Sequence, residues 1–275
     1  MNQGAELYLD LMKRCLMNTI YSQYEFREFI PHRAYKKWLF RLLVLPQFRR
    51  SKARAVTPYN YDEDTRLNGR DWSPIAHTMI GKKRLDNLHN CIQRVLDQNV
   101  PGDFIETGVW RGGATIFMRA MLKAFGDTTR TVWVADSFEG LPRPNAADYP
   151  EDEGDIHHTH PELAVDLETV KENFRRYNLL DDQVRFLKGW FKDTLPTAPI
   201  ERLAILRLDG DMYESTIQAL TSLYDKVSPG GFVIVDDYGA VEGCRTAVHD
   251  FRKSRQIEDP ITQIDWGGVF WQKRS

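Results

Sequence analysis

From about residue 75 onward, short apolar runs alternate along the chain with longer amphipathic segments. The apolar runs are brief, contain many branched or aromatic residues, and are bounded by Gly, Pro or Asp, which is typical of buried strands. They lie at 102–108, 130–138, 183–190, 201–209 and 231–237. The helical spacing of apolar residues predicts helices at 84–98, 111–125, 164–178 and 213–226.

This order of segments predicts an α/β fold. Strands that alternate with helices form a mostly parallel sheet through right-handed crossovers, and helices cover both of its faces. The chain ends differently, because "ITQID" and "VFWQK" flank Trp266-Gly267-Gly268, a pattern typical of an antiparallel hairpin. We therefore expect one antiparallel pair beside an otherwise parallel sheet.

Length and composition indicate one main domain with an appendage. The chain has 275 residues, 42% of them hydrophobic, which is enough to bury one sizeable core. We expect this domain over residues 75–275 and a helical N-terminal extension over residues 1–74. A formal net charge of -2 lacks the basic excess of a nucleic-acid coat, so we expect no nucleic-acid partner.

The cysteines and the N-terminal residues bear on the cellular compartment. Cys15, Cys91 and Cys244 lie far apart without CxxC spacing, which argues against a disulfide framework and against a cysteine zinc site. No signal-peptide pattern precedes the first apolar stretch, and that stretch is too short and too charged to span a bilayer. We expect a cytoplasmic protein.

In a parallel sheet, ligands bind at the carboxyl ends of the strands, so residues at those ends are candidates. The first predicted strand runs into "ETGVWRGGAT", whose glycines let the backbone approach a ligand at a helix N-terminus. A tight strand-to-helix turn needs such glycines without any ligand as well, and the spacing is not GxGxxG. Asp136 of "VADSF" is placed to bind a ribose diol, or alternatively to cap a turn.

Acidic residues follow two successive strands. Asp209 and Asp211 come after one strand, and Asp236 and Asp237 after the next, so we expect the four side chains to converge. Carboxylates packed together raise one another's pKa unless a cation compensates their charge. Oxygen ligands without His or Cys favour Mg²⁺, or else Mn²⁺ or Ca²⁺, over zinc. The alternative is that these acids cap helices and line solvated loops.

Four motifs in this order resemble the macrocin O-methyltransferase (TylF-like) family, which methylates sugar hydroxyls on macrolide and aminocoumarin antibiotics. They are "FIETGVWRGGA", "VWVADSFEGLP", "RLDGDMYEST" and "PGGFVIVDDYG", and the likeness covers about residues 66–273. The resemblance implies an S-adenosylmethionine-dependent and Mg²⁺-dependent methyltransferase on a Rossmann-like seven-stranded sheet. It makes Asp209, Asp236 and Asp237 metal ligands and Asp211 the general base.

The resemblance also implies the residues that contact S-adenosylmethionine. The methionine part would meet Glu106, Thr107 and Gly108, and the ribose Asp136 and Ser137. The adenine would meet Gly189, Trp190 and Phe191, although the two aromatic residues could equally be core residues that end a strand. The residues that would close over the cofactor from the N-terminal side are Thr78, Met79 and Ile80.

The chemistry of the expected reaction explains these residue types. A sugar hydroxyl is a poor nucleophile at neutral pH, because almost none of it is ionised. A divalent cation that holds two neighbouring hydroxyls stabilises the developing negative charge, while a carboxylate takes the proton. The acceptor we expect is therefore a small glycosylated molecule with a vicinal diol.

Two segments lack a pattern of regular structure. The acidic segment 142–168 is long enough for a lid or binding loop, and its histidines are more typical of exposed side chains than of a metal site. His158 is a reserve base in case Asp211 is structural. Residues 31–56 carry eight Lys or Arg and no acid, and look longer and more basic than we expect of the family.

For this basic segment we favour a solvated helix that covers the core or forms the seam of a homo-oligomer. Peripheral contact with an anionic membrane is the alternative. Two other functions are also open at this point. Asp209-Gly210-Asp211 matches the DxD pattern of Mn²⁺-dependent glycosyltransferases, and a non-catalytic binding subunit would need none of this chemistry.

Overall fold

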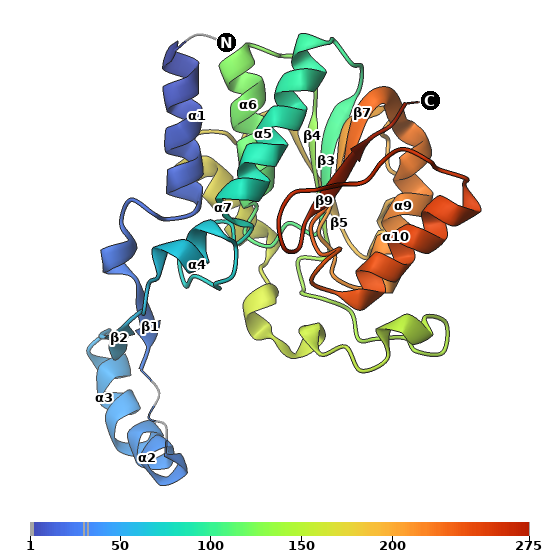
Figure 1. Cartoon of the computed structure of the whole chain (residues 1–275). Helices are drawn as coiled ribbons and strands as arrows, with labels where there is room; N and C mark the ends of the chain where they lie inside the picture. The colour runs from blue at the N-terminus through green and yellow to red at the C-terminus, as the bar shows by residue number, and fades with distance from the viewer. Residues whose placement is uncertain (1–2, 30, 32, 275) are drawn as a thin grey trace.

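The computed structural model describes residues 3–29, 31 and 33–274, and within them it contains a seven-stranded sheet with helices on both faces (Figure 1). The strands are β3 (Asp103–Thr107), β4 (Val132–Asp136), β5 (Val184–Lys188), β6 (Leu203–Leu208), β7 (Val227–Val235), β8 (Thr262–Gln263) and β9 (Val269–Gln272). Their order is β5-β4-β3-β6-β7-β9-β8. Strands β3 to β7 are parallel, whereas β9 runs antiparallel to both β7 and β8. The predicted α/β fold with its antiparallel C-terminal hairpin is confirmed.

The sheet is buried on both sides, because successive strand residues enter two different cores. On β3, Phe104 packs into one core and Ile105 into the other, and Val134 and Ala135 divide in the same way on β4. The first core is covered by α1 (Gln3–Leu16), α5 (Gly81–Asp97), α6 (Gly113–Phe125) and α7 (Leu167–Arg176). The second core is covered by α8 (Phe191–Thr194), α9 (Tyr213–Leu223) and α10 (Glu242–Ser254). This burial explains why the strands appear in the sequence as continuous apolar runs.

The predicted helices are present with shifted ends, and α10 is an additional helix that was not predicted. Its buried residues Cys244, Ala247, Val248 and Phe251 have helical spacing, so the signal was present in the sequence. Helix α7 begins three residues later than expected, because the Asp166 side chain accepts a hydrogen bond from the Thr169 N–H and caps the helix there.

The N-terminal region divides into two parts with different roles. Helix α1 packs against α6, and its Leu9 and Leu16 are fully buried in the first core, so this helix belongs to the main body rather than to an appendage. A following arm begins and ends with the paired strands β1 (Phe26–Glu28) and β2 (Val56–Pro58). Between them lie α2 (Ala34–Leu39), the π-helical turn η2 (Phe40–Val44) and α3 (Leu45–Arg50).

This arm projects away from the body (Figure 1). Its Trp38, Leu42 and Leu43 side chains are each more than half exposed, so the arm does not cover the core of its own chain. Of the two roles that we favoured for this segment, core cover is not seen, and the seam of a homo-oligomer stays a prediction. Across the described residues, every helix is too short or too polar to cross a bilayer. The short helix α4 (Glu63–Leu67) leads back to the body and to α5.

Candidate functional site

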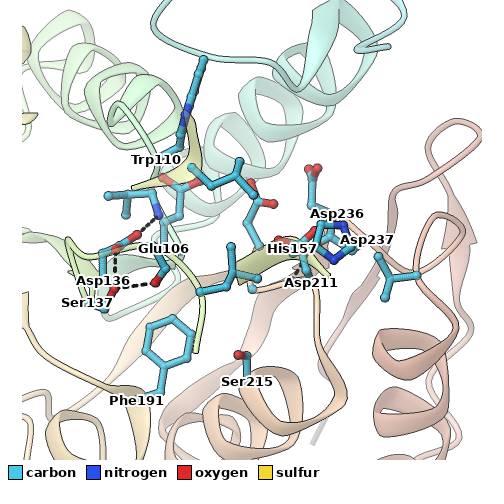
Figure 2. A pocket seen from close by; sticks show the side chains of 18 of the residues that line it. Glu106, Trp110, Asp136, Ser137, His157, Phe191, Asp211, Ser215, Asp236 and Asp237 are labelled. Carbon is cyan, nitrogen blue, oxygen red and sulfur yellow. Dashed lines mark hydrogen bonds between the residues drawn. The ribbon is translucent and has the colours of Figure 1, made fainter. Parts of the chain in front are cut away.

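A cavity of about 510 Å³ opens at the carboxyl ends of β3, β4, β6 and β7. Figure 2 shows polar side chains in two groups along it, with Glu106, Asp136 and Ser137 in one and Asp211, Asp236, Asp237 and His157 in the other. We call these the cofactor end and the acidic end. The cavity lies where strand ends of a parallel sheet place ligands.

The register of the sheet places the acids that follow β6 and β7 side by side at the carboxyl edge of the sheet. The Asp209 N–H donates to the Thr107 carbonyl oxygen at 2.9 Å, and the Asp236 N–H donates to the Leu208 carbonyl oxygen at 2.9 Å. Gly108 makes room for this turn, because a Cβ there would lie 1.8 Å from the Asp209 carbonyl oxygen, and its φ of +86° favours glycine. The glycine in "ETG" is therefore required by the approach of the neighbouring strand end.

The three predicted metal ligands lie together at the acidic end. Asp209, Asp236 and Asp237 each offer one carboxylate oxygen, and these oxygens lie within 4.8 Å of one another. Burial, followed by the negative charge of Asp236, raises the pKa of Asp209 to about 6. Burial, followed by the charge of Asp211, also raises the pKa of Asp237. Asp236 and Asp237 are buried and Asp209 is partly exposed, and a hard divalent cation fits this set of oxygen ligands and would relieve their repulsion.

Asp211 is held beside this group in an uncommon backbone conformation. Its φ is +58°, in the left-handed region, and its N–H donates to the Asp237 carboxylate at 3.0 Å. Burial, followed by the negative charge of Asp209, raises the pKa of Asp211 to about 7. A carboxylate with a pKa near neutrality can take a proton and release it again, which suits a general base.

Two arginines that the sequence patterns did not point to contact the same acids. Arg207 of β6 is buried and donates to Glu106, to Asp209 at 2.6 Å and to Asp236. Arg84 of α5 contacts Asp236 as well. A signal for Arg207 was present, because it is the one charged residue within the buried strand Leu203–Leu208. The position of Arg84 depends on how α5 packs, which the sequence pattern does not show.

At the cofactor end, Glu106 lines the cavity and has one carboxylate oxygen without a partner in the part of the chain that the structure describes. Its side chain is 2% exposed, one oxygen accepts from Arg207, and the other has no hydrogen-bond partner among the described residues. Burial raises the pKa of Glu106 to about 8. A buried oxygen without a partner is costly unless a ligand supplies a donor. The ammonium group of S-adenosylmethionine has the donors that this oxygen lacks.

Asp136 lines the cavity, but protein groups already occupy its oxygens. One oxygen accepts from the Val109 N–H at 2.8 Å and the other from the Phe138 N–H at 2.6 Å. The Ser137 hydroxyl donates to the Gly140 carbonyl oxygen at 2.7 Å. The turn-capping alternative is therefore present in the structure, and the ribose contact stays a prediction.

Most of the other predicted cofactor residues line the same cavity, including the segment that was expected to close over the cofactor. The lining residues from this set are Thr78, Met79, Ile80, Gly108, Gly189, Trp190 and Phe191. Phe191 also packs against the second core, so this aromatic residue is both a core residue and a lining residue. Thr107, which we expected to contact the cofactor, is the exception: it is buried and does not line the cavity. Neighbouring residues of a strand face opposite sides, so Thr107 points away from the side to which Glu106 points.

The segment 142–168 is anchored to the turn that carries Asp211. It contains the short helical turns η3 (Pro150–Asp152), η4 (His157–Thr159) and η5 (Pro161–Leu163). The buried Asp152 carboxylate accepts from the N–H groups of Tyr213 at 2.7 Å and Glu214 at 2.9 Å, at the start of α9. A carboxylate that caps a helix N-terminus from a distant segment fixes both together.

His157, rather than the reserve base His158, lines the cavity. Its Nδ1 lies 2.6 Å from an Asp155 carboxylate oxygen. Burial opposes the charged ring, but the negative charges of Asp211 and Asp155 outweigh burial and raise the pKa of His157. The choice among neighbouring histidines was beyond the sequence, because an irregular loop has no periodicity to orient its side chains.

The strand order and the acid-lined cavity at the strand ends define an α/β protein of Rossmann-like fold with its ligand site at the carboxyl edge of the sheet. The chain belongs to the macrocin O-methyltransferase (TylF) family, whose model matches residues 5–273. The match includes the arm, so the basic segment lies within the region that the family model covers. The protein is therefore an S-adenosylmethionine-dependent O-methyltransferase, as the names of similar proteins agree.

Similar proteins align over almost the whole chain. The 8-demethyl-8-(2,3-dimethoxy-alpha-L-rhamnosyl)-tetracenomycin-C 4'-O-methyltransferase of Streptomyces olivaceus is 54% identical, over 98% of this chain and 93% of its own. The demethyldecarbamoylnovobiocin O-methyltransferase of Streptomyces niveus is 49% identical, over 99% of this chain and 95% of its own. The solved structure of the O-methyltransferase NovP has a TM-score of 0.84 at 48% identity, over 98% of this chain and 100% of that one.

Proposed function

We propose that the protein methylates a hydroxyl of a sugar carried by a small natural product, with Asp211 as general base and Mg²⁺ held by Asp209, Asp236 and Asp237. The observation that carries this proposal is the position of Asp211 directly beside the three-acid group, joined to Asp237 by a hydrogen bond. The rhamnosyl group in the name of the similar Streptomyces olivaceus enzyme supports a sugar acceptor.

The residues of this chain divide the work between the two ends of the cavity. S-adenosylmethionine, when bound, supplies a methyl group on a positively charged sulfur. Glu106 would accept a hydrogen bond from its ammonium group, and Gly108 lets the backbone come close. These contacts position the methyl group, which is the main contribution a protein makes to a displacement reaction between two bound molecules.

At the acidic end, Asp211 is placed to take the proton of the acceptor hydroxyl. With S-adenosylmethionine bound, the new oxygen–methyl bond would form as the sulfur–methyl bond breaks, and S-adenosylhomocysteine would leave as a neutral thioether. Asp209, Asp236 and Asp237 would hold Mg²⁺, which when bound would supply positive charge to stabilise the negative charge that develops on the acceptor oxygen. A vicinal diol would offer two oxygens to the cation and is the acceptor feature we expect.

The mouth of the cavity suits a bulky acceptor. Trp72 and Trp266 line it, and each remains more than a third exposed. Sugar and polyketide rings pack well against such flat side chains, which combine apolar area with a polar edge. A glycosylated small molecule could therefore place its sugar at the acidic end while the remainder contacts these rings.

We also infer that the arm mediates a homo-oligomer. The exposed side chains Trp38, Leu42 and Leu43 support contact with another surface. Light scattering after size-exclusion chromatography would measure the mass in solution, and a monomer would contradict the inference. Co-sedimentation with vesicles of phosphatidylglycerol, compared with phosphatidylcholine, would reveal the membrane contact that we do not favour.

A methyl-transfer assay tests the proposed function. The purified protein would be incubated with S-adenosylmethionine labelled in its methyl group and with glycosylated polyketides, matched aglycones and free sugars. We expect label in the glycosylated acceptors, loss of transfer after treatment with EDTA, and recovery with added Mg²⁺. Transfer that is indifferent to EDTA would contradict the metal, and label in the aglycones would contradict the sugar acceptor.

A further inference from the structure

The carboxylate of Asp236 has both oxygens engaged by guanidinium groups. One oxygen accepts from Arg207 and the other from Arg84, and all three side chains are almost completely buried. Yet Asp236 is one of the three acids whose oxygens cluster as a cation site. A cation that takes an oxygen of Asp236 would therefore either displace one of these arginines or share the oxygen with it and be repelled by its charge.

Arg207 is the arginine that is held in place. It extends from a central strand of the sheet, is 1% exposed, and shares its guanidinium among Glu106, Asp209 and Asp236. Three carboxylates hold this one guanidinium inside the sheet, so it cannot turn away from Asp236 without also disturbing its contacts with Glu106 and Asp209. Breaking up a buried set of paired charges is strongly unfavourable.

Arg84 has a second partner already in contact. Its Nε donates to both carboxylate oxygens of Asp265, at 2.9 and 3.2 Å, while its Nη1 contacts Asp236. Its remaining terminal nitrogen, Nη2, has no hydrogen-bond partner among the described residues. A small rotation can therefore exchange one contact for another without leaving the guanidinium unpaired.

Asp265 is built to receive this charge. Its Oδ1 accepts from the N–H groups of Gly267 at 2.9 Å and Gly268 at 2.8 Å, which fixes the carboxylate in the turn before β9. The Arg84 guanidinium lies over the Trp266 ring, with its central carbon 5.0 Å from the ring centroid. Arg84 is thus held between a movable contact at the acidic end and a fixed one in the C-terminal hairpin.

We propose that Arg84 occupies the place of the divalent cation on Asp236 in the metal-free enzyme, and that it withdraws to Asp265 when the cation binds. The inference rests on the proposed metal site and adds a residue that sets the affinity of that site. Arg84 compensates the acidic end before the cation arrives, and it lowers the affinity for the cation by competing for the same oxygen.

Titration calorimetry with MgCl₂, without cofactor, tests this directly. Arg84→Met should tighten the dissociation constant for Mg²⁺ about tenfold, because repulsion between neighbouring cations in a buried site is at least that large. Asp265→Asn should weaken it, because Arg84 then has only Asp236 as a charged partner. Asn keeps the oxygen that caps the turn, so the hairpin should be preserved.

Two comparisons test whether Arg84 acts by occupying the cation's place on Asp236, and not merely by adding positive charge near the site. Arg70→Met removes another arginine that stacks on Trp266 but does not contact Asp236, and it should leave the dissociation constant unchanged within about twofold. In the Arg84→Met background, Asp265→Asn should have no further effect, since it acts through Arg84. Melting temperatures would confirm that each variant folds.

The outcomes are distinguishable. Wild-type protein that binds no Mg²⁺ would remove the metal site and this inference together. Wild-type protein that binds Mg²⁺ while Arg84→Met binds it equally or more weakly would overturn only the inference, and would make Arg84 a residue that organises the site. If Arg84→Met does not fold, equal weakening by Asp265→Asn and Arg70→Met would overturn it.

Discussion

At the cofactor end of the cavity a buried acid is held by backbone N–H groups, whereas at the acidic end buried acids face one another. Asp136 accepts two backbone hydrogen bonds, and these oppose the effect of burial on its pKa. Asp209, Asp211 and Asp237 have fewer such donors, and the pKa of each is raised by burial and then by the charge of a neighbouring acid. The oxygens of Asp136 are satisfied by the protein alone, whereas the repulsion at the acidic end supports the proposed cation site.

This difference distinguishes an acid that stabilises a local turn from the acids that we propose to bind the metal or transfer a proton. A carboxylate whose oxygens are satisfied by the backbone fixes a turn and gains little from a ligand. Carboxylates that repel one another keep a high affinity for positive charge, and the repulsion is released when a cation binds. Substitutions at the two ends should therefore change different measurements.

The largest effect is expected for Asp211→Asn, which removes the proposed base. Turnover should fall about a thousandfold, as typical for loss of a general base. The dissociation constant for S-adenosylhomocysteine should change less than about twofold, because Asp211 lies at the acidic end. The exposed Asp182→Asn serves as a control and should keep wild-type turnover. A turnover near that of the wild type in Asp211→Asn would give the role of base to another residue, with His157 as the first candidate.

A smaller effect is expected for Asp237→Asn, which removes the charge of one proposed metal ligand but keeps an oxygen for the Asp211 N–H. Turnover at limiting Mg²⁺ should fall about a hundredfold, since lost interactions at metal sites cost that much. Excess Mg²⁺ should restore much of it. An activity that no concentration of Mg²⁺ improves would contradict the role of ligand.

Asp136→Asn should act on stability rather than on metal dependence. The amide can accept only one of the two backbone hydrogen bonds, so the free energy of unfolding should fall by about 1–3 kcal/mol. Urea denaturation would measure this loss. The concentration of Mg²⁺ that gives half-maximal activity should not change, and a shift in it would break the distinction between the two ends.

The smallest effect concerns pH. The pKa of Asp211 is raised from 3.8 to about 7 in the folded, metal-free protein. The folded state therefore holds a proton that the unfolded state has lost, and this contribution to stability disappears as pH rises from about 4 to about 7.

The Asp211→Asn variant has no carboxyl group at this position and so does not lose a proton in this pH range. In EDTA its melting temperature should rise relative to that of the wild type by several degrees as pH increases through this window. Adding Mg²⁺ to the wild type should recover part of the difference at the upper end. Asp182→Asn should run parallel to the wild type, and a parallel course for Asp211→Asn would show that its carboxyl is not perturbed.

The sequence indicated the strands and the position of the site, since buried strands have a simple apolar pattern and ligands lie at their carboxyl ends. Asp209, Asp236 and Asp237 came from this rule and from the family resemblance, and the structure brings them together. The rule could not show that the Asp136 oxygens would accept hydrogen bonds from the Val109 and Phe138 N–H groups. An acid that caps a turn and an acid that binds a ligand look alike in sequence.

By itself, the sequence determined the alternation of strands and helices and the acids that follow β6 and β7, because these depend on local patterns and on neighbouring strand ends. Only the tertiary structure decided which cations meet those acids. Arg84 and Asp236 are far apart along the chain, and the contact between them exists because α5, β7 and the C-terminal hairpin pack together. Pairings of that kind depend on the arrangement of whole elements, which no local pattern records.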